Sequence, residues 1–183
     1  MTEESTTPKF GAEARRRDFL YVATATVGTV GAALTMWPLI ANLNPSADVL
    51  SFSTVEVDLT PIQLGQRITA KWRGNPIFIS HRTKAEIETV RADDGSPGLL
   101  DPERDEDRVQ RPEWLIIIGV CTHLGCIPLG QGPDEPHGAF GGWYCPCHGS
   151  VYDASGRVRR RPAPRNLEVP TYKFLTDARV VIG

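Results

Sequence analysis

Two short segments, Cys121-Thr-His123-Leu-Gly-Cys126 and Cys145-Pro-Cys147-His148-Gly-Ser150, contain every cysteine of this 183-residue chain. Each segment offers one Cys and one His that can face the same way, together with a second cysteine. Three kinds of site are compatible with this content: a structural zinc bound by Cys and His, a pair of disulfides, and an iron–sulfur cluster held by one Cys and one His from each segment.

The composition outside these segments is that of a loop-rich β protein. The chain has 17 Gly and 15 Pro, and its net charge of −2 gives no reason to expect nucleic-acid binding. Alternating or dense apolar residues predict short strands at 53–59, 67–73, 76–80, 114–120, 167–169, 172–174 and 179–182. Residues 83–91 are predicted to form a short helix with Thr83 as its N-terminal cap. The predicted fold class is therefore all-β.

The N-terminal part predicts a membrane anchor. No residue from Phe19 to Ala47 is charged, and the apolar part, residues 19–41, reaches about 34 Å as a helix. This run is longer than the apolar core of a cleaved signal peptide, so we expect a retained transmembrane helix. Arg15-Arg16-Arg17-Asp18-Phe19-Leu20 precedes it, and this order resembles a twin-arginine export signal; a plain positive flank is the alternative. Residues 1–18 are thus expected in the cytoplasm, with the C-terminal domain on the far side of the membrane in an oxidising, periplasm-like space.

Two charged segments lie in the C-terminal part. Residues 93–107 hold seven acidic residues and one arginine, a local charge of −6, and predict a solvated loop, with a partner-docking surface as the alternative. A basic run follows later in the chain and contains Arg157, Arg159, Arg160, Arg161 and Arg165. It can pair with an acidic partner or with the acidic loop, and the pattern does not decide between them.

Residues 42–50 are predicted to form a tether that lets a head domain, residues 51–183, move relative to its anchor.

The pattern C-x-H-x2-C followed by C-x-C-H-G-S resembles the Rieske iron–sulfur protein family. The resemblance implies one [2Fe-2S] cluster per chain, with two Cys on one iron and two His on the other. The implied ligands are Cys121, His123, Cys145 and His148. It also implies a disulfide between Cys126 and Cys147, which agrees with an oxidising location. Residues implied to tune or shield the cluster are Ser150, Tyr152 and Leu124. Their structural alternatives are a turn cap, a core tyrosine and plain packing.

The resemblance extends beyond these segments. The anchor, the tether and the head together resemble the Rieske subunits of bacterial quinol–cytochrome c reductase, the cytochrome bc complex, of alphaproteobacterial type. Arg-Arg-Asp-Phe-Leu-Tyr at 16–21 and Asn-Pro-Ser-Ala-Asp-Val at 44–49 carry this similarity. It implies an antiparallel base domain with an inserted cluster-binding subdomain at about 119–158, behind one transmembrane helix. Val151, where His is frequent in the family, and Arg161, where Gly is usual, depart from the pattern.

The function implied by this resemblance is electron transfer inside an enzyme complex. The head would accept an electron from ubiquinol, with a proton on a His ligand, and pass the electron to a c-type cytochrome haem by moving. The implied partners are a cytochrome b subunit, a c-type cytochrome subunit, ubiquinol and membrane lipid, in a dimeric complex of the bacterial inner membrane. The chain would then be an oxidoreductase and translocase subunit, without turnover of its own.

Three alternatives remain open. The first is a Rieske subunit of another exported oxidoreductase, such as an arsenite oxidase, which need not keep the long anchor or the tether. The second is a Rieske domain of a ring-hydroxylating oxygenase, but those domains normally lack the extra cysteine pair found here at Cys126 and Cys147. The third is a structural zinc module, which predicts bound zinc and no redox activity.

Overall fold

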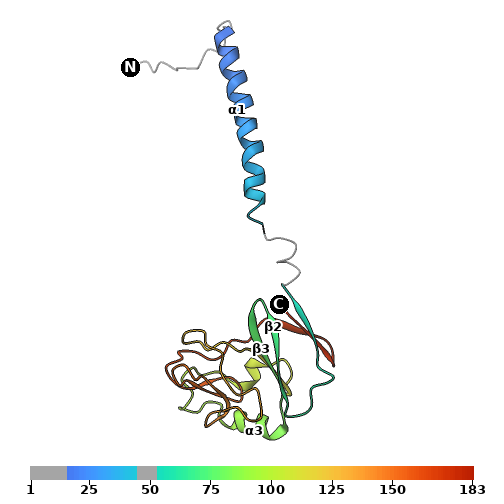
Figure 1. Cartoon of the computed structure of the whole chain (residues 1–183), viewed down its shortest axis with the longest axis vertical. Coiled ribbons are helices and arrows are strands. Elements are labelled where there is room, and N and C mark those ends of the chain that lie inside the picture. The colour runs from blue at the N-terminus through green and yellow to red at the C-terminus, as the bar shows by residue number, and fades with distance from the viewer. Residues whose placement is uncertain (1–15, 45–52) are drawn as a thin grey trace, which may run out of the picture. The chain divides into compact units, whose positions relative to one another are not determined.

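The computed structural model describes residues 16–44 and 53–183, and the chain divides into two compact units, residues 1–47 and 48–183. The described part of the first unit is helix α1, Arg16–Ala41, which begins three residues before the predicted apolar run (Figure 1). Its 26 residues extend about 39 Å, and none of its side chains is buried. Threonine hydroxyls donate to carbonyls one turn back, as Thr29 does to Ala25 at 2.7 Å, so these polar groups are satisfied within the helix. Helix α1 is therefore long and apolar enough to cross a membrane.

The head contains three antiparallel sheets of three strands each, and two of them form the base domain. The first has the order β1-β9-β8, with bounds Val55–Asp58, Arg179–Ile182 and Tyr172–Thr176. The second has the order β2-β3-β4, with bounds Arg67–Trp72, Asn75–His81 and Trp114–Ile118 (Figure 1). Six of the seven predicted strands correspond to these elements. Leu167–Val169 is not a strand, because its pairing with β4 is reduced to one backbone bond, Ile118 N–H to Glu168 O at 2.7 Å.

Strands β3 and β4 are buried on both faces, which explains their dense apolar sequences. Successive side chains of a strand point to opposite faces. Ile77 and Ile116 pack into the core shared with the β1-β9-β8 sheet. Phe78 and Ile117 point the other way, into a second core that includes Cys121 and the cluster-binding subdomain. This sheet is therefore the layer on which the two cysteine segments are built.

Helix α3, Lys84–Ala92, is confirmed with the cap expected from the sequence. The Thr83 hydroxyl accepts from the Glu86 backbone N–H at 3.2 Å, and Glu86 returns a bond to the Thr83 N–H at 2.8 Å. Such a capping box depends only on residues three positions apart, so the sequence is enough to recognise it.

The third sheet was not predicted. It has the order β5-β6-β7, with bounds Gly141–Tyr144, Val151–Asp153 and Val158–Arg160. These strands are three or four residues long, and their ladders contain register shifts, so they show no clear alternation of apolar residues. They carry the second cysteine segment in the connection between β5 and β6.

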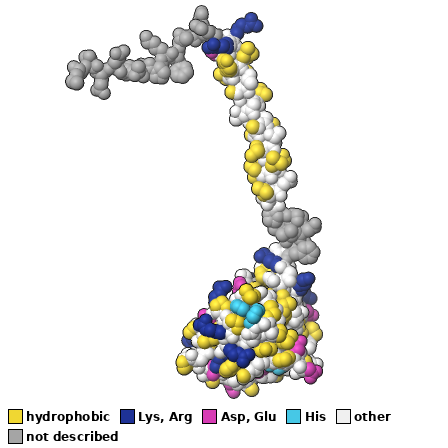
Figure 2. Space-filling view, turned by 60° about the vertical axis from the view of Figure 1, so that its left-hand side comes forward, with side chains coloured by type: hydrophobic (Ala, Val, Ile, Leu, Met, Phe, Trp, Pro, Cys, Tyr) yellow, Lys and Arg dark blue, Asp and Glu magenta, His cyan; other side chains and the backbone are white. Residues whose placement is uncertain are grey.

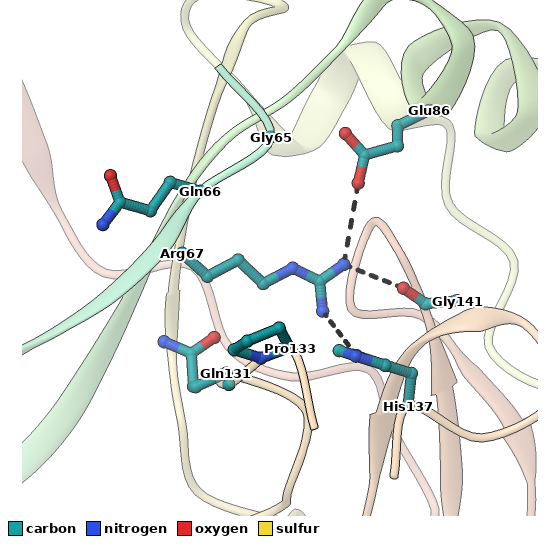
Figure 3. Close-up of a pocket in the computed structure, with 9 residues that line it drawn as sticks. Gly65, Gln66, Arg67, Glu86, Gln131, Pro133, His137 and Gly141 are labelled. Atoms are coloured by element: carbon teal, nitrogen blue, oxygen red, sulfur yellow. Dashed lines mark hydrogen bonds and ion pairs between the residues drawn. The ribbon is translucent and has the colours of Figure 1, made fainter. Parts of the chain in front are cut away.

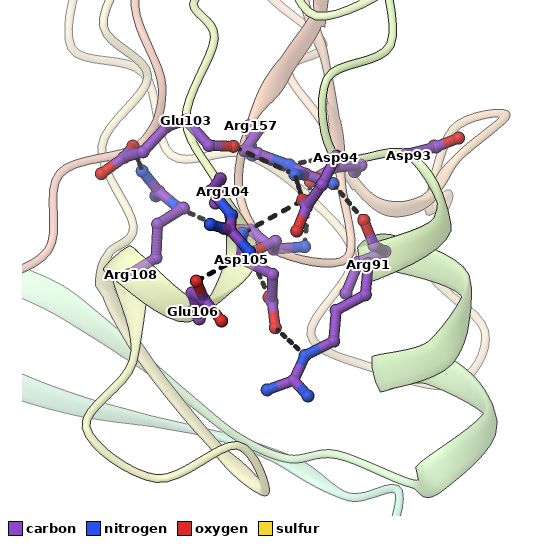
Figure 4. Close-up of polar contacts among 12 residues, drawn as sticks. Arg91, Asp93, Asp94, Glu103, Arg104, Asp105, Glu106, Arg108 and Arg157 are labelled. Carbon is purple, nitrogen blue, oxygen red and sulfur yellow. Dashed lines mark hydrogen bonds and ion pairs between the residues drawn. The ribbon is translucent and has the colours of Figure 1, made fainter.

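The acidic segment packs against the basic run, contrary to the prediction of a solvated loop. Arg157 has a fully buried side chain that pairs with Asp153 and Asp94 and donates to the carbonyls of Val90 and Glu103 (Figure 4). Burial alone would lower the pKa of Arg157, but the two carboxylates outweigh it and raise that pKa. The prediction of a solvated loop is wrong because Arg157 and Asp94, which are about 60 positions apart in the sequence, form an ion pair inside the fold.

A second buried pair lies in the same network. Asp105, in the short 3-10 helix η1 (Asp105–Arg108), has no exposed surface and receives hydrogen bonds from Arg82 and from the Ser155 hydroxyl. Arg91 lies 3.5 Å from its other carboxylate oxygen. Glu106 and Asp107, its neighbours, are exposed as predicted. The acidic segment is thus partly an internal set of counter-charges that ties the base domain to the β6-β7 hairpin.

The stability of the head is expected to fall in acid because of Asp105. Burial opposes ionisation of this carboxylate, yet the bonds from Arg82 and Ser155 hold its pKa below the ordinary value of 3.8. A lowered pKa in the folded state adds stability that is present above the ordinary value and is lost as the pH falls through the folded-state pKa. The free energy of unfolding, measured with urea between pH 7 and pH 3, should therefore decline as the pH falls. In Asp105→Asn this decline should be smaller, and the variant should already be less stable at pH 7. If the free energy of unfolding of Asp105→Asn falls with pH as steeply as that of the unaltered chain, Asp105 is not the cause of the acid sensitivity.

Candidate metal centre

The two cysteine segments form loops with the same backbone hydrogen bonds. In the first, Cys121 N–H donates to Cys126 O at 2.8 Å, and Gly125 N–H donates to Cys121 O at 2.9 Å. In the second, Cys145 N–H donates to Ser150 O and Gly149 N–H donates to Cys145 O, both at 2.9 Å. The glycine four positions after each first cysteine has a φ near +80°, at +82° for Gly125 and +81° for Gly149. This left-handed conformation favours glycine and turns each loop back on itself.

The loops bring the four predicted ligands to one tip of the head. Cys121 and Cys145 are free thiols and are buried, each with 2 % of its surface exposed. His123 is half-buried and His148 is exposed. The two imidazole rings face each other edge to face, with centroids 4.7 Å apart. The sulfur donors therefore lie inside and the nitrogen donors lie at the surface.

The remaining two cysteines are joined to each other. A disulfide links Cys126 of the first loop to Cys147 of the second, as the resemblance implied. The sulfur atoms of Cys126, Cys145 and Cys147 lie within 4.8 Å of one another, but two of them share this bond. Only Cys145 of that group is available as a thiolate ligand, because a disulfide sulfur does not ionise.

Tyr152 in β6 and Ser150, the residue just before β6, make hydrogen bonds around the loops. The Tyr152 hydroxyl donates to the Cys121 sulfur at 3.2 Å and accepts from the Thr122 backbone N–H at 3.3 Å. The buried Ser150 hydroxyl accepts from the Ala163 N–H at 2.9 Å, and no acceptor for its own proton lies among residues 53–183 as described. Tyr152 therefore reaches a ligand sulfur, and Ser150 holds the segment that follows β7 against the second loop.

The Cys145 thiol and the Tyr152 hydroxyl hold their protons more tightly than usual in this environment. Burial raises the pKa of the Cys145 thiol, and the neighbouring Cys121 raises it further. Burial and the bond to Cys121 likewise raise the pKa of the Tyr152 hydroxyl. Iron binding at the Cys145 sulfur must therefore displace a proton.

Exposed apolar side chains lie in the same loop as His123. Leu124 is 71 % exposed and Ile127 is 56 % exposed, so plain core packing does not describe Leu124. Figure 2 shows histidine side-chain atoms next to hydrophobic side chains on one face of the head. Exposed apolar groups of this kind mark contact surfaces.

Arg67 was missed by the sequence analysis, although it joins the base domain to the subdomain that carries the second loop (Figure 3). Its guanidinium donates to the carbonyls of Gly130, Gly141 and Gly142 at 2.8–3.0 Å and stacks on Trp143, with 4.6 Å to the ring centroid. His137 and Glu86 line the same cleft of about 650 Å³. An arginine in an alternating strand gives no local signal for such a role, because its acceptors lie more than 60 positions away.

The donor set fits an iron–sulfur cluster. Two buried thiols and two facing imidazoles match a cluster with sulfur ligands on one iron and nitrogen ligands on the other. The hydroxyl of Tyr152 is directed at a ligand sulfur, and the Ser150 hydroxyl retains a free proton beside the same loops. The donor types alone also suit zinc. Comparison with known proteins distinguishes the iron–sulfur cluster from zinc.

Residues 104–173 match the family described as Rieske [2Fe-2S] domain. Residues 6–46 match the family described as Ubiquitinol-cytochrome C reductase Fe-S subunit TAT signal. A ubiquinol-cytochrome c reductase iron-sulfur subunit of Rhodospirillum rubrum is 54 % identical over 180 residues, covering 98 % of both chains. The chain belongs to the family of ubiquinol-cytochrome c reductase iron-sulfur subunits. It therefore carries a Rieske [2Fe-2S] cluster and is a membrane-anchored, single-pass subunit of an oxidoreductase complex.

More distant relatives agree with this assignment. The mitochondrial Rieske subunit of the cytochrome b-c1 complex of Neurospora crassa is 50 % identical over 168 residues, which cover 90 % of this chain and 70 % of that protein. A chain from the structure titled hyperthermophilic respiratory Complex III has a TM-score of 0.50 at 24 % identity, covering 87 % of this chain and 98 % of its own length, and it supports the fold. The predicted all-β Rieske fold behind one apolar helix is confirmed, and the arsenite oxidase alternative is not favoured.

Proposed function

We propose that Cys121, His123, Cys145 and His148 hold the cluster and that the head carries single electrons from ubiquinol to a c-type cytochrome haem. The observation that carries the proposal is the pair of matching loops, which places two buried thiols and two outward imidazoles at one tip. When bound, the cluster supplies a one-electron acceptor whose potential is raised because two thiolates are replaced by neutral histidines. The disulfide between Cys126 and Cys147 keeps the two loops together.

The two histidines have a second role in the proposal. Each imidazole binds iron through one ring nitrogen and keeps the other free to exchange a proton. His148 is exposed and His123 is half-buried, so both rings are accessible at the tip. Quinol oxidation releases protons together with electrons, so the free ring nitrogen of one of these histidines accepts a proton from the quinol. Leu124, exposed beside them, packs against the quinol-site surface and excludes water.

The partners follow from the same role. We infer a cytochrome b subunit that supplies most of the quinol pocket, a c-type cytochrome subunit that supplies the haem, and a dimeric complex around them. Support comes from relatives that are named as subunits of ubiquinol-cytochrome c reductase and of the cytochrome b-c1 complex. Lipid surrounds the apolar helix α1.

The proposed location is the bacterial inner membrane, with the N-terminus in the cytoplasm and the head in the periplasm. Arg15, Arg16 and Arg17 precede the apolar run, and positive charge favours the cytoplasmic side. A structural disulfide favours an oxidising space on the other side. In this layout residues 1–18 are the cytoplasmic tail, 19–41 the anchor, 42–50 the tether and 51–183 the head, with a cluster-binding subdomain at about 119–158.

Low-temperature EPR tests the proposal. Membranes that contain the chain should give a rhombic Rieske signal after reduction with ascorbate, because the centre has a high potential. A signal that appears only with dithionite would indicate a low-potential Rieske protein and contradict the quinol–cytochrome c role. No signal, together with zinc found by metal analysis, would overturn the cluster itself.

Stiffening the tether is expected to slow turnover without removing the cluster. The predicted tether ends at Leu50, and residues 45–52 lie outside the described part of the chain. Replacing both Ser46 and Ala47 with proline favours an extended, semi-rigid segment and should restrict movement of the head. Ubiquinol–cytochrome c turnover should fall several-fold while the EPR signal keeps its size, with Ser46→Ala as the control. Full activity with the stiffened tether would contradict a moving head.

Tyr152→Phe is expected to lower the reduction potential. The variant removes the hydroxyl that donates to the Cys121 sulfur at 3.2 Å, a bond that favours the more negative, reduced state. A differential loss of about 1 kcal/mol corresponds to a fall of roughly 40 mV for one electron. Redox titration followed by EPR measures the shift, and Tyr172→Phe, which removes a hydroxyl of the base domain, serves as control. An unchanged potential in Tyr152→Phe would show that this bond does not tune the centre.

A further inference from the structure

The basic run divides into an inward and an outward set. Arg157 and Arg159 have side chains that are 0 % and 8 % exposed, and they pair with Asp153, Asp94 and Asp93. The other three arginines are exposed, and no ion pair among the described residues includes them. These three are called the arginine rim: Arg160, Arg161 and Arg165.

The arginine rim lies beside both cluster loops. Arg160 Nε donates to the carbonyl of Gly149 at 2.8 Å, next to the exposed His148. The carbonyl of Arg165 accepts from the Thr122 hydroxyl at 2.6 Å, next to the first loop. The rim residues are thus held at the tip by its own hydrogen bonds.

The segment between these two contacts is also fixed. Ala163 N–H donates to the buried Ser150 hydroxyl at 2.9 Å, so the chain that follows β7 runs along the second loop. Arg161 lies in this segment, is exposed, and its side chain forms no hydrogen bond within residues 53–183 as described. Its charge is therefore presented to solvent in a segment that is bonded to the second loop at Ser150.

The three charges differ in how far the protein itself offsets them. Arg165 lines a cavity of about 400 Å³ with Asp101, Glu103 and Glu168, although none of these carboxylates pairs with it. Arg160 and Arg161 form no ion pair with a carboxylate among the described residues. The tip therefore presents the exposed apolar Leu124 together with exposed arginines held near the same loops, a combination found at protein interfaces.

We propose that the arginine rim binds carboxylates on the surface of the electron acceptor, around the edge of its haem. This inference rests on the proposed function, which makes a c-type haem protein the acceptor. Of the two redox partners, ubiquinol is uncharged, whereas haem carries propionates. The guanidinium fork matches a carboxylate with two parallel hydrogen bonds. The rim thereby favours docking of the tip at the acceptor and orients it there.

The first test measures electron transfer from the reduced cluster to the c-type haem in the whole complex. The double variant Arg161→Gln/Arg165→Gln should slow this step about three- to tenfold at low salt, because attraction between opposite charges speeds association. The difference should vanish at high salt, where charges are screened. Lys71→Gln/Lys173→Gln removes two exposed charges from the base domain and should leave the rate unchanged. An unchanged rate in the rim variant, or an equal slowing at both salt concentrations, would overturn the proposal.

The same variants separate this inference from the proposed function. The EPR signal and its potential should be unchanged in the rim variant, because neither side chain contacts a ligand. If the unaltered complex lacks an ascorbate-reducible signal, the proposed function fails, and the cross-linking test below still decides whether the rim contacts carboxylates.

A lipid surface is tested by placing the complex in vesicles of phosphatidylcholine alone or with phosphatidylglycerol. A rim effect that requires the anionic lipid would assign the rim to a membrane surface and overturn the protein partner.

Zero-length cross-linking tests the contact directly. Arg161→Lys/Arg165→Lys keeps both charges and introduces two amines, which a carbodiimide couples to a carboxylate as an amide. Mass spectrometry should find position 161 or 165 joined to an acidic residue or a propionate of the haem subunit. Cross-links confined to this chain's own Asp101 or Glu168, or to another subunit, would overturn the proposal.

Discussion

Cys121→Ala and Cys145→Ala are each expected to abolish cluster binding. Both cysteines are free and almost fully buried, and each provides the only available sulfur of its loop. Removing one thiolate leaves an iron with an open position in a site that offers no replacement donor. Affinity should fall on the order of 100-fold or more, since even altering groups around a metal ligand costs 10–100-fold. Iron and acid-labile sulfide per chain, together with EPR, measure the loss.

The matched control is the other pair of cysteines. Cys126→Ala/Cys147→Ala removes the same atoms from both loops but leaves the four proposed ligands in place. This variant should still contain iron and show the Rieske signal when prepared under mild conditions. Loss of the cluster in the control, with retention in Cys121→Ala, would contradict the ligand assignment and favour a site built from the other sulfurs.

Among the substitutions considered, Arg157→Ala is expected to lower the free energy of unfolding of the head most. The side chain is completely buried and pairs with Asp153 and Asp94. Its removal leaves the buried Asp153 with Arg159, at 3.6 Å, as its remaining ion-pair partner. Breaking a buried ion pair by removing one partner costs about 3–5 kcal/mol. For a head of this size that corresponds to roughly 10–20 °C in the unfolding temperature. Far-UV circular dichroism of the cluster-loaded chain in detergent measures the shift.

An exposed arginine provides the comparison. Arg179 pairs with Glu56 at 3.0 Å, but both side chains are about half exposed, so Arg179→Ala should cost less than about 1 kcal/mol. If Arg157→Ala destabilises no more than Arg179→Ala does, the buried network does not hold the β6-β7 hairpin to the base domain. Cluster content measured in parallel shows whether the two loops loosen together with the hairpin.

Local patterns accounted for the features that depend on neighbouring residues. The capping box at Thr83 and Glu86 spans three positions, and the apolar run at 19–41 needs no partner to be recognised. The cysteine segments belong to the same class, because each loop closes on itself through bonds between residues four or five positions apart. The equal spacing from Cys121 to Gly125 and from Cys145 to Gly149 was a further signal in the sequence. It could have predicted two loops of matching shape.

Features that depend on distant partners were missed or left open. Leu167–Val169 has the residues of a strand, yet a strand exists only where a neighbour completes the ladder, and here β4 supplies a single backbone bond. The role of Arg67 depends on carbonyls that fold back from more than 60 positions away. Strands β5, β6 and β7 are too short to show a pattern of their own.

The sequence by itself indicated the membrane anchor, the all-β class and the two cysteine loops, because each depends on residues close together along the chain. The kind of cofactor followed from the family resemblance of those loops. Only the tertiary structure decided which charges of the basic run are used inside the protein and which face outward. Arg157 and Arg160 are both arginines of the same basic run, three positions apart. Arg157 is buried between Asp153 and Asp94, whereas Arg160 is exposed beside Gly149. Burial of a charge depends on the carboxylates that the fold places around it, and no local pattern contains that information.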